Sequence, residues 1–300
     1  MSVVDRTIVA LMPLVPKFIV GRVARPYIAG DTLEDAVRTV RSLMEEGCMA
    51  TVDVLGEEVD RIEQTEGFTR QYLETLDRIE EEGLDANVSV KLSALGQSVD
   101  NELCEENLRK ILERARDQGN FVRIDMEDSS TIDRTLDTYR KFRKEFTNLG
   151  VVLQSYMKRS MDDIRSLIPL DVNVRVCKGI YVEPPEIAYQ DKQKIRDNFM
   201  EMTGALLAEG CYTGIATHDR QLVERSFELV ERLELDREEY EFQMLLGVLP
   251  GLRREIVEAG HRLRVYVPYG EAWYAYSTRR LKENPAVAGH VVRGMFSFGG

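Results

Sequence analysis

Short runs of apolar and β-branched residues alternate along this 300-residue chain with helical segments that end at glycine. The eight strand candidates are CMATVDVLG, NVSVKLSAL, FVRIDME, GVVLQSY, VNVRVCKG, YTGIATHD, YEFQMLLGV and LRVYVPYG. Between them lie stretches with apolar residues at three- and four-residue spacing, such as 107–119, 134–146 and 222–235. Strict alternation of strands and helices predicts a parallel sheet, and eight repeats predict its closure into an α/β barrel of the (β/α)8 type.

Glycines mark the expected helix ends, where the backbone often takes a positive φ. These stops are Gly47, Gly83, Gly119, Gly150, Gly210 and Gly260. A doubly wound sheet is the alternative, but no G-x-G-x-x-G or P-loop motif follows a strand candidate. No linker or low-complexity tract interrupts the chain. We therefore expect residues 1–300 to form a single barrel domain, with residues 1–47 as an N-terminal helical extension.

The apolar stretch at residues 7–21, TIVALMPLVPKFIVG, is interrupted by Pro13, Pro16 and Lys17. It is too short to span a bilayer and lacks a small-residue cleavage site. We expect an amphipathic helix that is packed or partly exposed, and contact with a membrane or a partner is the alternative.

Composition excludes several classes of function. The formal net charge of -12 argues against a nucleic-acid partner, because phosphate binding requires a basic surface, and it disfavours an anionic membrane surface. The four cysteines form no C-x-x-C pair, which suits reduced thiols in a cytoplasm. The three histidines lack metal-ligand spacing, so we expect no catalytic metal.

Polar residues stand at the ends of almost all strand candidates, where the active sites of such barrels lie. They are Asp53, Lys91, Asp125, Glu127, Gln154, Arg175, Lys178, His218, Gln243 and Tyr266. Any one of them alone could be a loop residue or a structural hydrogen-bonding group. Together they indicate a ligand site, because unpaired buried polar groups are costly.

The stretch VRVCKGIY places two cations, Arg175 and Lys178, around the end of the fifth strand candidate, with Tyr181 just beyond. Two cations at the mouth of an apolar barrel indicate an anionic or electron-rich ligand. They could polarise a carbonyl, stabilise a phosphate or stabilise an anionic reduced cofactor.

The segment YAYSTRRLKENP, residues 274–285, follows the last strand candidate and so faces the same mouth. On a helix, Tyr276, Arg279, Arg280 and Glu283 fall within roughly one 100° arc. An arginine pair can clamp a carboxylate through bidentate hydrogen bonds, and a nearby carboxylate suits an amine. This combination indicates an amino-acid zwitterion, whereas a solvated helix face with paired charges is the alternative.

Seven motifs resemble those of the proline dehydrogenases, which are flavoenzymes with a distorted (β/α)8 barrel. In chain order they are SVKLSAL, RIDME, VLQSY, VRVCKGIY, ATHD, FQMLLGV and YSTRRLKENP. The resemblance runs from about residue 40 to residue 290, and Tyr-x-x-Arg-Arg-x-x-Glu is its most specific piece. The length is similar to that of the stand-alone bacterial type, without the fused aldehyde dehydrogenase domain of the bifunctional chains.

The resemblance implies a role for each matching residue. Arg279, Arg280 and Lys91 would bind the proline carboxylate, and Glu283 would lie near the amine or hold Arg280. Tyr181, Tyr276 and Tyr266 would surround the ring, Asp125 would be the active-site aspartate, and Arg175 would sit at the flavin N5 edge. The residues that would hold FAD, together with Arg175, are Met126, Gln154, Lys178, Gly179, Ile180, Thr217 and His218. Met126, Cys177 and Ile180 depart from the commonest family pattern without removing a charge.

The implied reaction is oxidation of L-proline to 1-pyrroline-5-carboxylate by hydride transfer to FAD, the first step of proline catabolism to glutamate. The cofactor must carry this step because side chains cannot accept a hydride. The resemblance also implies a membrane quinone as electron acceptor, a pyrroline-5-carboxylate dehydrogenase as partner, and a cytoplasmic enzyme at most peripheral to the inner face of the membrane.

Two rival functions remain. A Schiff-base lyase of the aldolase type would use Lys178 or Lys91 as nucleophile, which explains the lysines but not the arginine pair. A non-catalytic barrel that binds an amino acid is the other. A yellow protein that proline bleaches would exclude both.

Overall fold

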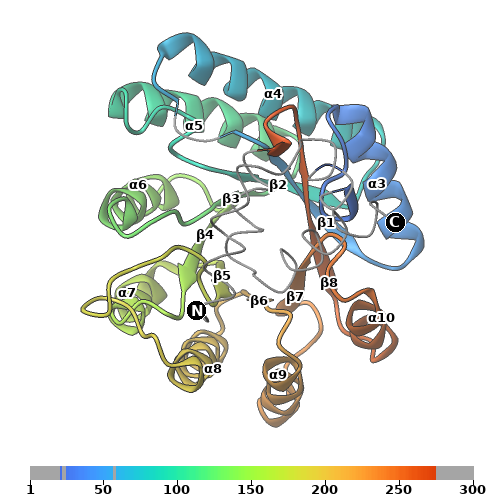
Figure 1. Ribbon diagram of the computed structural model, residues 1–300, viewed down its shortest axis with the longest axis vertical. Helices are drawn as coiled ribbons and strands as arrows, with labels where there is room; N and C mark the ends of the chain where they lie inside the picture. Colours follow the sequence, from blue (N-terminus) through green and yellow to red (C-terminus); the bar gives the residue numbers. More distant parts are fainter. Residues whose placement is uncertain (1–20, 22–24, 57–58, 275–300) are drawn as a thin grey trace, which may run out of the picture.

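Eight parallel strands pair in chain order and close into a barrel, β1-β2-β3-β4-β5-β6-β7-β8, as the strand count predicts. The computed structural model describes residues 21, 25–56 and 59–274. Figure 1 looks into the barrel and shows the helices arranged around the outside of the ring of strands. The strands are β1 Met49–Val54, β2 Ala86–Val90, β3 Val122–Ile124, β4 Leu149–Gln154, β5 Val174–Cys177, β6 Thr213–Ala216, β7 Tyr240–Leu245 and β8 Leu263–Tyr269.

Each strand leads to the next through a crossover that carries a helix on the outside of the barrel, the connection that parallel neighbours require. These helices are α4 Ile62–Glu81, α5 Asn101–Asp117, α6 Ile132–Arg143, α7 Ser160–Leu167, α8 Lys192–Ala208, α9 Arg220–Arg232 and α10 Pro250–Glu258. The short 3-10 turns are η2 Arg25–Tyr27 and η3 Ile168–Leu170.

Helix α3, Leu33–Glu45, precedes the barrel and packs against β1 and β8. It begins at Thr32, whose side chain and that of Asp35 form a reciprocal capping box. The rest of the expected N-terminal extension, residues 1–20 and 22–24, lies outside the described residues. Within the described part of the chain, no helix has the length and apolar character needed to cross a membrane.

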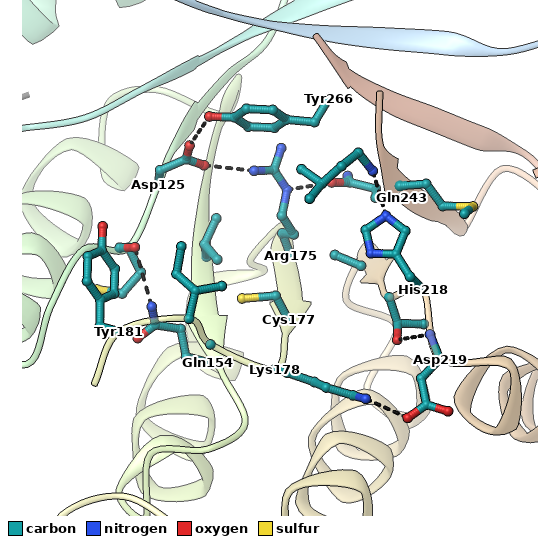
Figure 2. A pocket seen from close by; sticks show the side chains of 18 of the residues that line it. Asp125, Gln154, Arg175, Cys177, Lys178, Tyr181, His218, Asp219, Gln243 and Tyr266 are labelled. Carbon is teal, nitrogen blue, oxygen red and sulfur yellow. Dashed lines mark hydrogen bonds and ion pairs between the residues drawn. The ribbon is translucent and has the colours of Figure 1, made fainter. Parts of the chain in front are cut away.

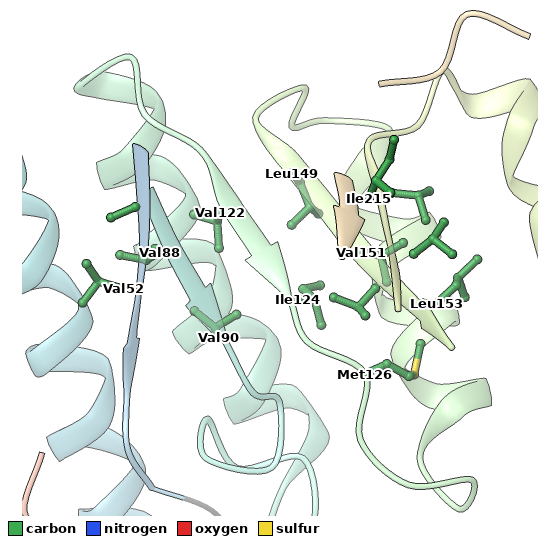
Figure 3. Close-up of a cluster of buried hydrophobic side chains, with 14 of the residues drawn as sticks. Val52, Val88, Val90, Val122, Ile124, Met126, Leu149, Val151, Leu153 and Ile215 are labelled. Carbon is green, nitrogen blue, oxygen red and sulfur yellow. The ribbon is translucent and has the colours of Figure 1, made fainter. Parts of the chain in front are cut away.

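The two faces of the strands differ in chemistry. On β2, Val88 and Val90 belong to the buried apolar layer between sheet and helices, which Figure 3 shows with its counterparts on β1, β3 and β4. The alternate positions Asn87 and Ser89 are buried and polar. Because side chains alternate across a strand, the polar set faces the barrel interior, which other (β/α)8 barrels fill with branched aliphatic residues.

Five of the six glycines predicted to end helices have the positive φ expected there. They are Gly47, Gly83, Gly119, Gly210 and Gly260, with φ between 59° and 79°. The prediction for Gly150 is wrong: α6 ends at Arg143, and Gly150 lies inside β4. Its role is steric, because a Cβ there would stand 2.8 Å from the backbone oxygen of Asn173 and 2.9 Å from Nη1 of Arg123.

We expect Gly150→Ala to lower the free energy of unfolding by ~1–3 kcal/mol, since the added methyl group overpacks a rigid site. Gly67→Ala is the matched control, because Gly67 lies within α4 and a Cβ added there would meet no atom within 4 Å. Alanine should stabilise that helix by ~0.5–1 kcal/mol. Urea unfolding followed by circular dichroism measures both, and a stabilised Gly150→Ala variant would contradict the steric argument.

Candidate active site

A cavity of about 540 Å³ opens at the carboxyl ends of the strands, where barrel active sites lie. The described residues to which the family resemblance gives a role all line it: Lys91, Asp125, Met126, Gln154, Arg175, Lys178, Gly179, Ile180, Tyr181, Thr217, His218 and Tyr266. Of the other polar residues at strand ends, Gln243 lines it as well, whereas Asp53 and Glu127 do not. Figure 2 shows Asp125, Gln154, Arg175, His218 and Tyr266 around the cavity, each from a different strand or the loop that follows it. The predicted residues Tyr276, Arg279, Arg280 and Glu283 lie outside the described residues.

Asp125, just after β3, is the centre of the cavity's charged cluster. Its Oδ1 accepts hydrogen bonds from Nη1 of Arg175 at 2.7 Å and from Oγ of Ser89 at 3.0 Å. The hydroxyl of Tyr266 donates to Oδ2 at 2.8 Å. Burial alone would raise the pKa of Asp125, but Arg175 and Lys91 outweigh it and hold the pKa below its ordinary value. Asp125 is therefore an ionised acceptor that orients Arg175.

Arg175 on β5 is almost wholly buried, yet its guanidinium is only partly used. Its Nε donates to Oε1 of Gln243 and its Nη1 donates to Asp125. Its Nη2 has no hydrogen-bond partner among the residues that the structure describes. A buried guanidinium donor without an acceptor is costly, so Nη2 is available for a ligand atom with a lone pair or negative charge.

Lys91, which follows β2, is paired with a carboxylate deeper in the barrel. Its Nζ donates to both oxygens of Asp53, at 2.8 and 2.9 Å, and to the hydroxyl of Tyr266 at 3.4 Å. Burial alone would lower the pKa of this ammonium, but Asp53 and Asp125 outweigh burial and raise the pKa. Lys91 therefore stays protonated beside the cavity, as a cation and not as a nucleophile.

The loop after β5 forms one wall of the cavity. Lys178 donates to Oδ2 of Asp219, which also accepts from Nε of Arg196 at 2.7 Å. Gly179 has a φ of 98°, and a Cβ there would stand 2.2 Å from the ring of Tyr156. Only glycine fits here, because any side chain would overlap Tyr156.

A backbone hydrogen bond fixes the tautomer of His218. The backbone N–H of Leu245 donates to its Nε2 at 2.8 Å, so this nitrogen carries no proton and Nδ1 must carry one. Gln154, at the end of β4, donates from Nε2 to the backbone oxygens of Met126 and Glu127, at 3.5 and 3.4 Å. Its Oε1 has no partner within the described ranges. The cavity thus offers one buried acceptor besides its cations.

Sequence reasoning did not assign a site role to Asp53, Asp219 or Gln243, which complete the network. Asp53 and Gln243 were visible as polar residues at strand ends, but their partners lie 38 and 68 residues away along the chain. Asp219 carried a local signal, since it follows a strand and its Oδ1 accepts from the N–H of Gln221 as the N-cap of α9. Cys177 also lines the cavity.

Comparison with known proteins points to one family. The family model for proline dehydrogenase matches residues 36–293. Proline dehydrogenase 1 of Bacillus subtilis (strain 168) is 38% identical over 272 residues, which cover 91% of this chain and 90% of the relative. The proline dehydrogenase of Deinococcus radiodurans is 36% identical over 277 residues, covering 91% and 89%.

A longer protein of known structure is similar over part of its length. The structure of proline utilization A (PutA) from Bdellovibrio bacteriovorus, inactivated by N-propargylglycine, superposes with a TM-score of 0.82 at 25% identity. The match covers 88% of this chain and 33% of that one. The barrel therefore corresponds to about a third of the larger protein.

We expect Asp53→Asn to lower the free energy of unfolding by ~3–5 kcal/mol, because it leaves the Lys91 ammonium buried without its counter-ion. Asp77→Asn is the matched control, since Asp77 pairs with Arg114 where both side chains are about 40% exposed. Its loss should stay below ~1 kcal/mol. Denaturant titration of the two variants compares them, and equal losses would show that the buried pair contributes no more than a surface pair.

Proposed function

Because the chain belongs to the proline dehydrogenase family, we propose that it is an FAD-dependent enzyme that oxidises L-proline to 1-pyrroline-5-carboxylate. The observation that carries the proposal is the buried guanidinium of Arg175, held by Asp125 and Gln243 with Nη2 left for a ligand. When bound, the flavin would supply the hydride acceptor at N5 that side chains lack.

The cavity's donors and acceptors fit a flavin. Isoalloxazine presents both lone pairs and N–H groups, which match the unpartnered Nη2 of Arg175 and Oε1 of Gln154 among the described residues. We assign the cofactor to Met126, Gln154, Arg175, Lys178, Gly179, Ile180, Thr217 and His218, all of which line the cavity. The cations Arg175 and Lys178 would stabilise negative charge there.

We assign the substrate to other residues of the same cavity. Lys91 and Tyr266 line the cavity beside Asp125, and Tyr181 lies in its wall. Arg279, Arg280 and Glu283, with Tyr276, would supply the carboxylate clamp and the group near the amine. The secondary amine must be neutral for its lone pair to assist hydride departure, and surrounding cations favour loss of its proton.

The Schiff-base alternative fits the geometry less well. A nucleophilic lysine must be neutral, but Asp53 and Asp125 raise the pKa of Lys91, and Lys178 is ion-paired with Asp219. A barrel that only binds an amino acid would show no change in its absorbance spectrum when proline is added.

The experiment that tests the proposal is an absorbance spectrum of the purified protein before and after anaerobic addition of L-proline.

We further propose a membrane quinone as electron acceptor, with peripheral contact at the membrane, and a pyrroline-5-carboxylate dehydrogenase as the enzyme that receives the product. These proposals rest on family membership alone. Proline-dependent reduction of a soluble quinone analogue tests the first of them.

For Arg175→Ala we expect FAD to be partly retained and flavin reduction by proline to slow about 30- to 1,000-fold, which corresponds to ~2–4 kcal/mol of lost charge stabilisation. Arg220→Ala is the control, because Arg220 pairs with Glu255 on the exposed face of α9. Rapid-mixing absorbance under anaerobic conditions measures both rates. An unchanged rate in Arg175→Ala would remove Arg175 from the active site.

For Arg279→Ala and Arg280→Ala we expect each loss to raise the dissociation constant of tetrahydrofuran-2-carboxylate, a proline mimic without the amine, about ten- to a hundredfold. Each lost bond to a partly desolvated carboxylate is worth ~1.5–3 kcal/mol. Arg280→Lys should be impaired as well, because lysine keeps the charge but not the fork. The flavin spectrum reports the titration. Unchanged affinity in the double alanine variant would return this segment to a solvated helix face.

A further inference from the structure

A buried carboxylate lies beneath the cavity, where it touches neither the cavity nor solvent. Glu241 on β7 is 1% exposed, and its oxygens accept from Nε of Arg264 at 2.9 and 3.0 Å. The hydroxyl of Tyr212 donates to its Oε2 at 2.9 Å. Burial alone would raise the pKa of Glu241, but Arg264 and Arg123 bring it down to about 2. Glu241 is therefore an ionised group that can only accept hydrogen bonds.

Gln243, two residues further along β7, connects this carboxylate to the cavity. Its Nε2 donates to Oε1 of Glu241, and its Oε1 accepts from Nε of Arg175. Figure 2 shows Gln243 beside Arg175 with this bond drawn. An amide can in general be turned by 180°, but here its neighbours leave one orientation. Glu241 cannot donate and Arg175 cannot accept, so the amide must present nitrogen below and oxygen above.

The backbone is shaped around this amide. A Cβ at Gly214, on the neighbouring strand β6, would stand 2.7 Å from Nε2 and 3.2 Å from Cδ of Gln243. The space that glycine leaves is therefore filled by the side chain that joins Glu241 to Arg175. With Nε held by Gln243 and Nη1 by Asp125, two fixed bonds define the plane of the guanidinium. The direction of Nη2 follows from that plane.

We propose that Glu241 is a positioning residue, which acts through Gln243 to fix the guanidinium of Arg175 so that Nη2 faces the ligand. The inference rests on the proposed function for the role of Arg175 toward a cofactor. It goes beyond that proposal by assigning a function to a carboxylate that no ligand reaches.

The competing role for Glu241 is charge balance alone. Arg264 and Arg123 are both buried, and a carboxylate between them would be required even if Gln243 were absent. The two roles predict different behaviour at Arg175. Charge balance affects the stability of the whole barrel, whereas positioning affects the hydrogen bond on Nε of Arg175 and the chemistry at Nη2.

The test compares Glu241→Gln with Tyr212→Phe, which removes a hydrogen bond to the same carboxylate on the side away from Gln243. The holoenzyme is labelled with ¹⁵N-arginine, and solvent exchange of the Arg175 Nε–H is measured together with the rate of flavin reduction at saturating proline. We expect Glu241→Gln to accelerate the exchange and to slow reduction about tenfold, with an unchanged KM for proline. Tyr212→Phe should stay within about twofold of the unchanged protein in both measurements.

A second pair of variants keeps the test decisive if Glu241→Gln unfolds. Gln243→Met removes the acceptor of Arg175 without touching the ion pair of Glu241 and Arg264, and should reproduce the fast exchange. The double variant Glu241→Gln with Gln243→Glu swaps the two side chains. It keeps the net charge and gives Nε of Arg175 a carboxylate as acceptor. We expect it to restore slow exchange.

Equal exchange and reduction rates in Glu241→Gln and Tyr212→Phe would overturn the positioning role, as would normal exchange in Gln243→Met. Failure of the proposed function is a separate result. If the unchanged protein binds no flavin or fails to react with proline, that proposal falls, while the exchange of the Arg175 Nε–H still decides whether Glu241 and Gln243 position Arg175.

Discussion

The interior of this barrel depends on the pairing of buried charges. Among the residues that the structure describes, charged side chains gather inside the barrel, and they include Asp53, Lys91, Arg123, Asp125, Arg175, Glu241 and Arg264. In a medium of low dielectric constant an unpaired ion is so costly that each charge needs an opposite charge or hydrogen-bonding acceptors, as Arg123 finds in Oδ1 of Asn173 at 2.7 Å. Three ion pairs each join two different strands or their ends: Asp53 with Lys91, Asp125 with Arg175 and Glu241 with Arg264. The ion pairs therefore depend on the register of the strands and on the closure of the barrel.

The two faces of the sheet have different roles: the outer face stabilises the domain, and the inner face carries the polar groups of the cavity. The outer face carries valine, isoleucine and leucine, which pack under the helices and supply the large apolar burial that stabilises the domain. This leaves the inner face free to be polar. Glycines complete the arrangement where polar side chains are large, since Gly150 makes room for Arg123 and Gly214 for Gln243. A single methyl group at either position would displace a side chain of the charged network.

The architecture could be predicted from the sequence because alternation is a local signal, and the polar strand ends followed from it. The pairings could not. That Lys91 meets Asp53 depends on the parallel register of β1 and β2, which pairs Asp53 with Ser89 and so brings Lys91 above it. The wrong prediction that Gly150 ends a helix has the same origin. In sequence, a glycine that ends a helix cannot be told from one that makes room for a distant side chain, which here is Arg123. The segment with Arg279 and Arg280 shows the converse case, since its pattern is plain in sequence and lies outside the described residues.

One donor in this network stands apart from the rest. Arg175 uses Nε and Nη1 on Gln243 and Asp125, and within the described part of the chain Nη2 has no acceptor. The two satisfied bonds hold the guanidinium rigid, so the unsatisfied one has a fixed direction before any ligand arrives. A ligand that supplies the acceptor removes a desolvation penalty of ~1–3 kcal/mol without ordering a side chain. The binding energy can then orient the ligand, because folding has already fixed the conformation of the Arg175 side chain. This buried donor thus makes the cavity selective for an electron-rich ligand.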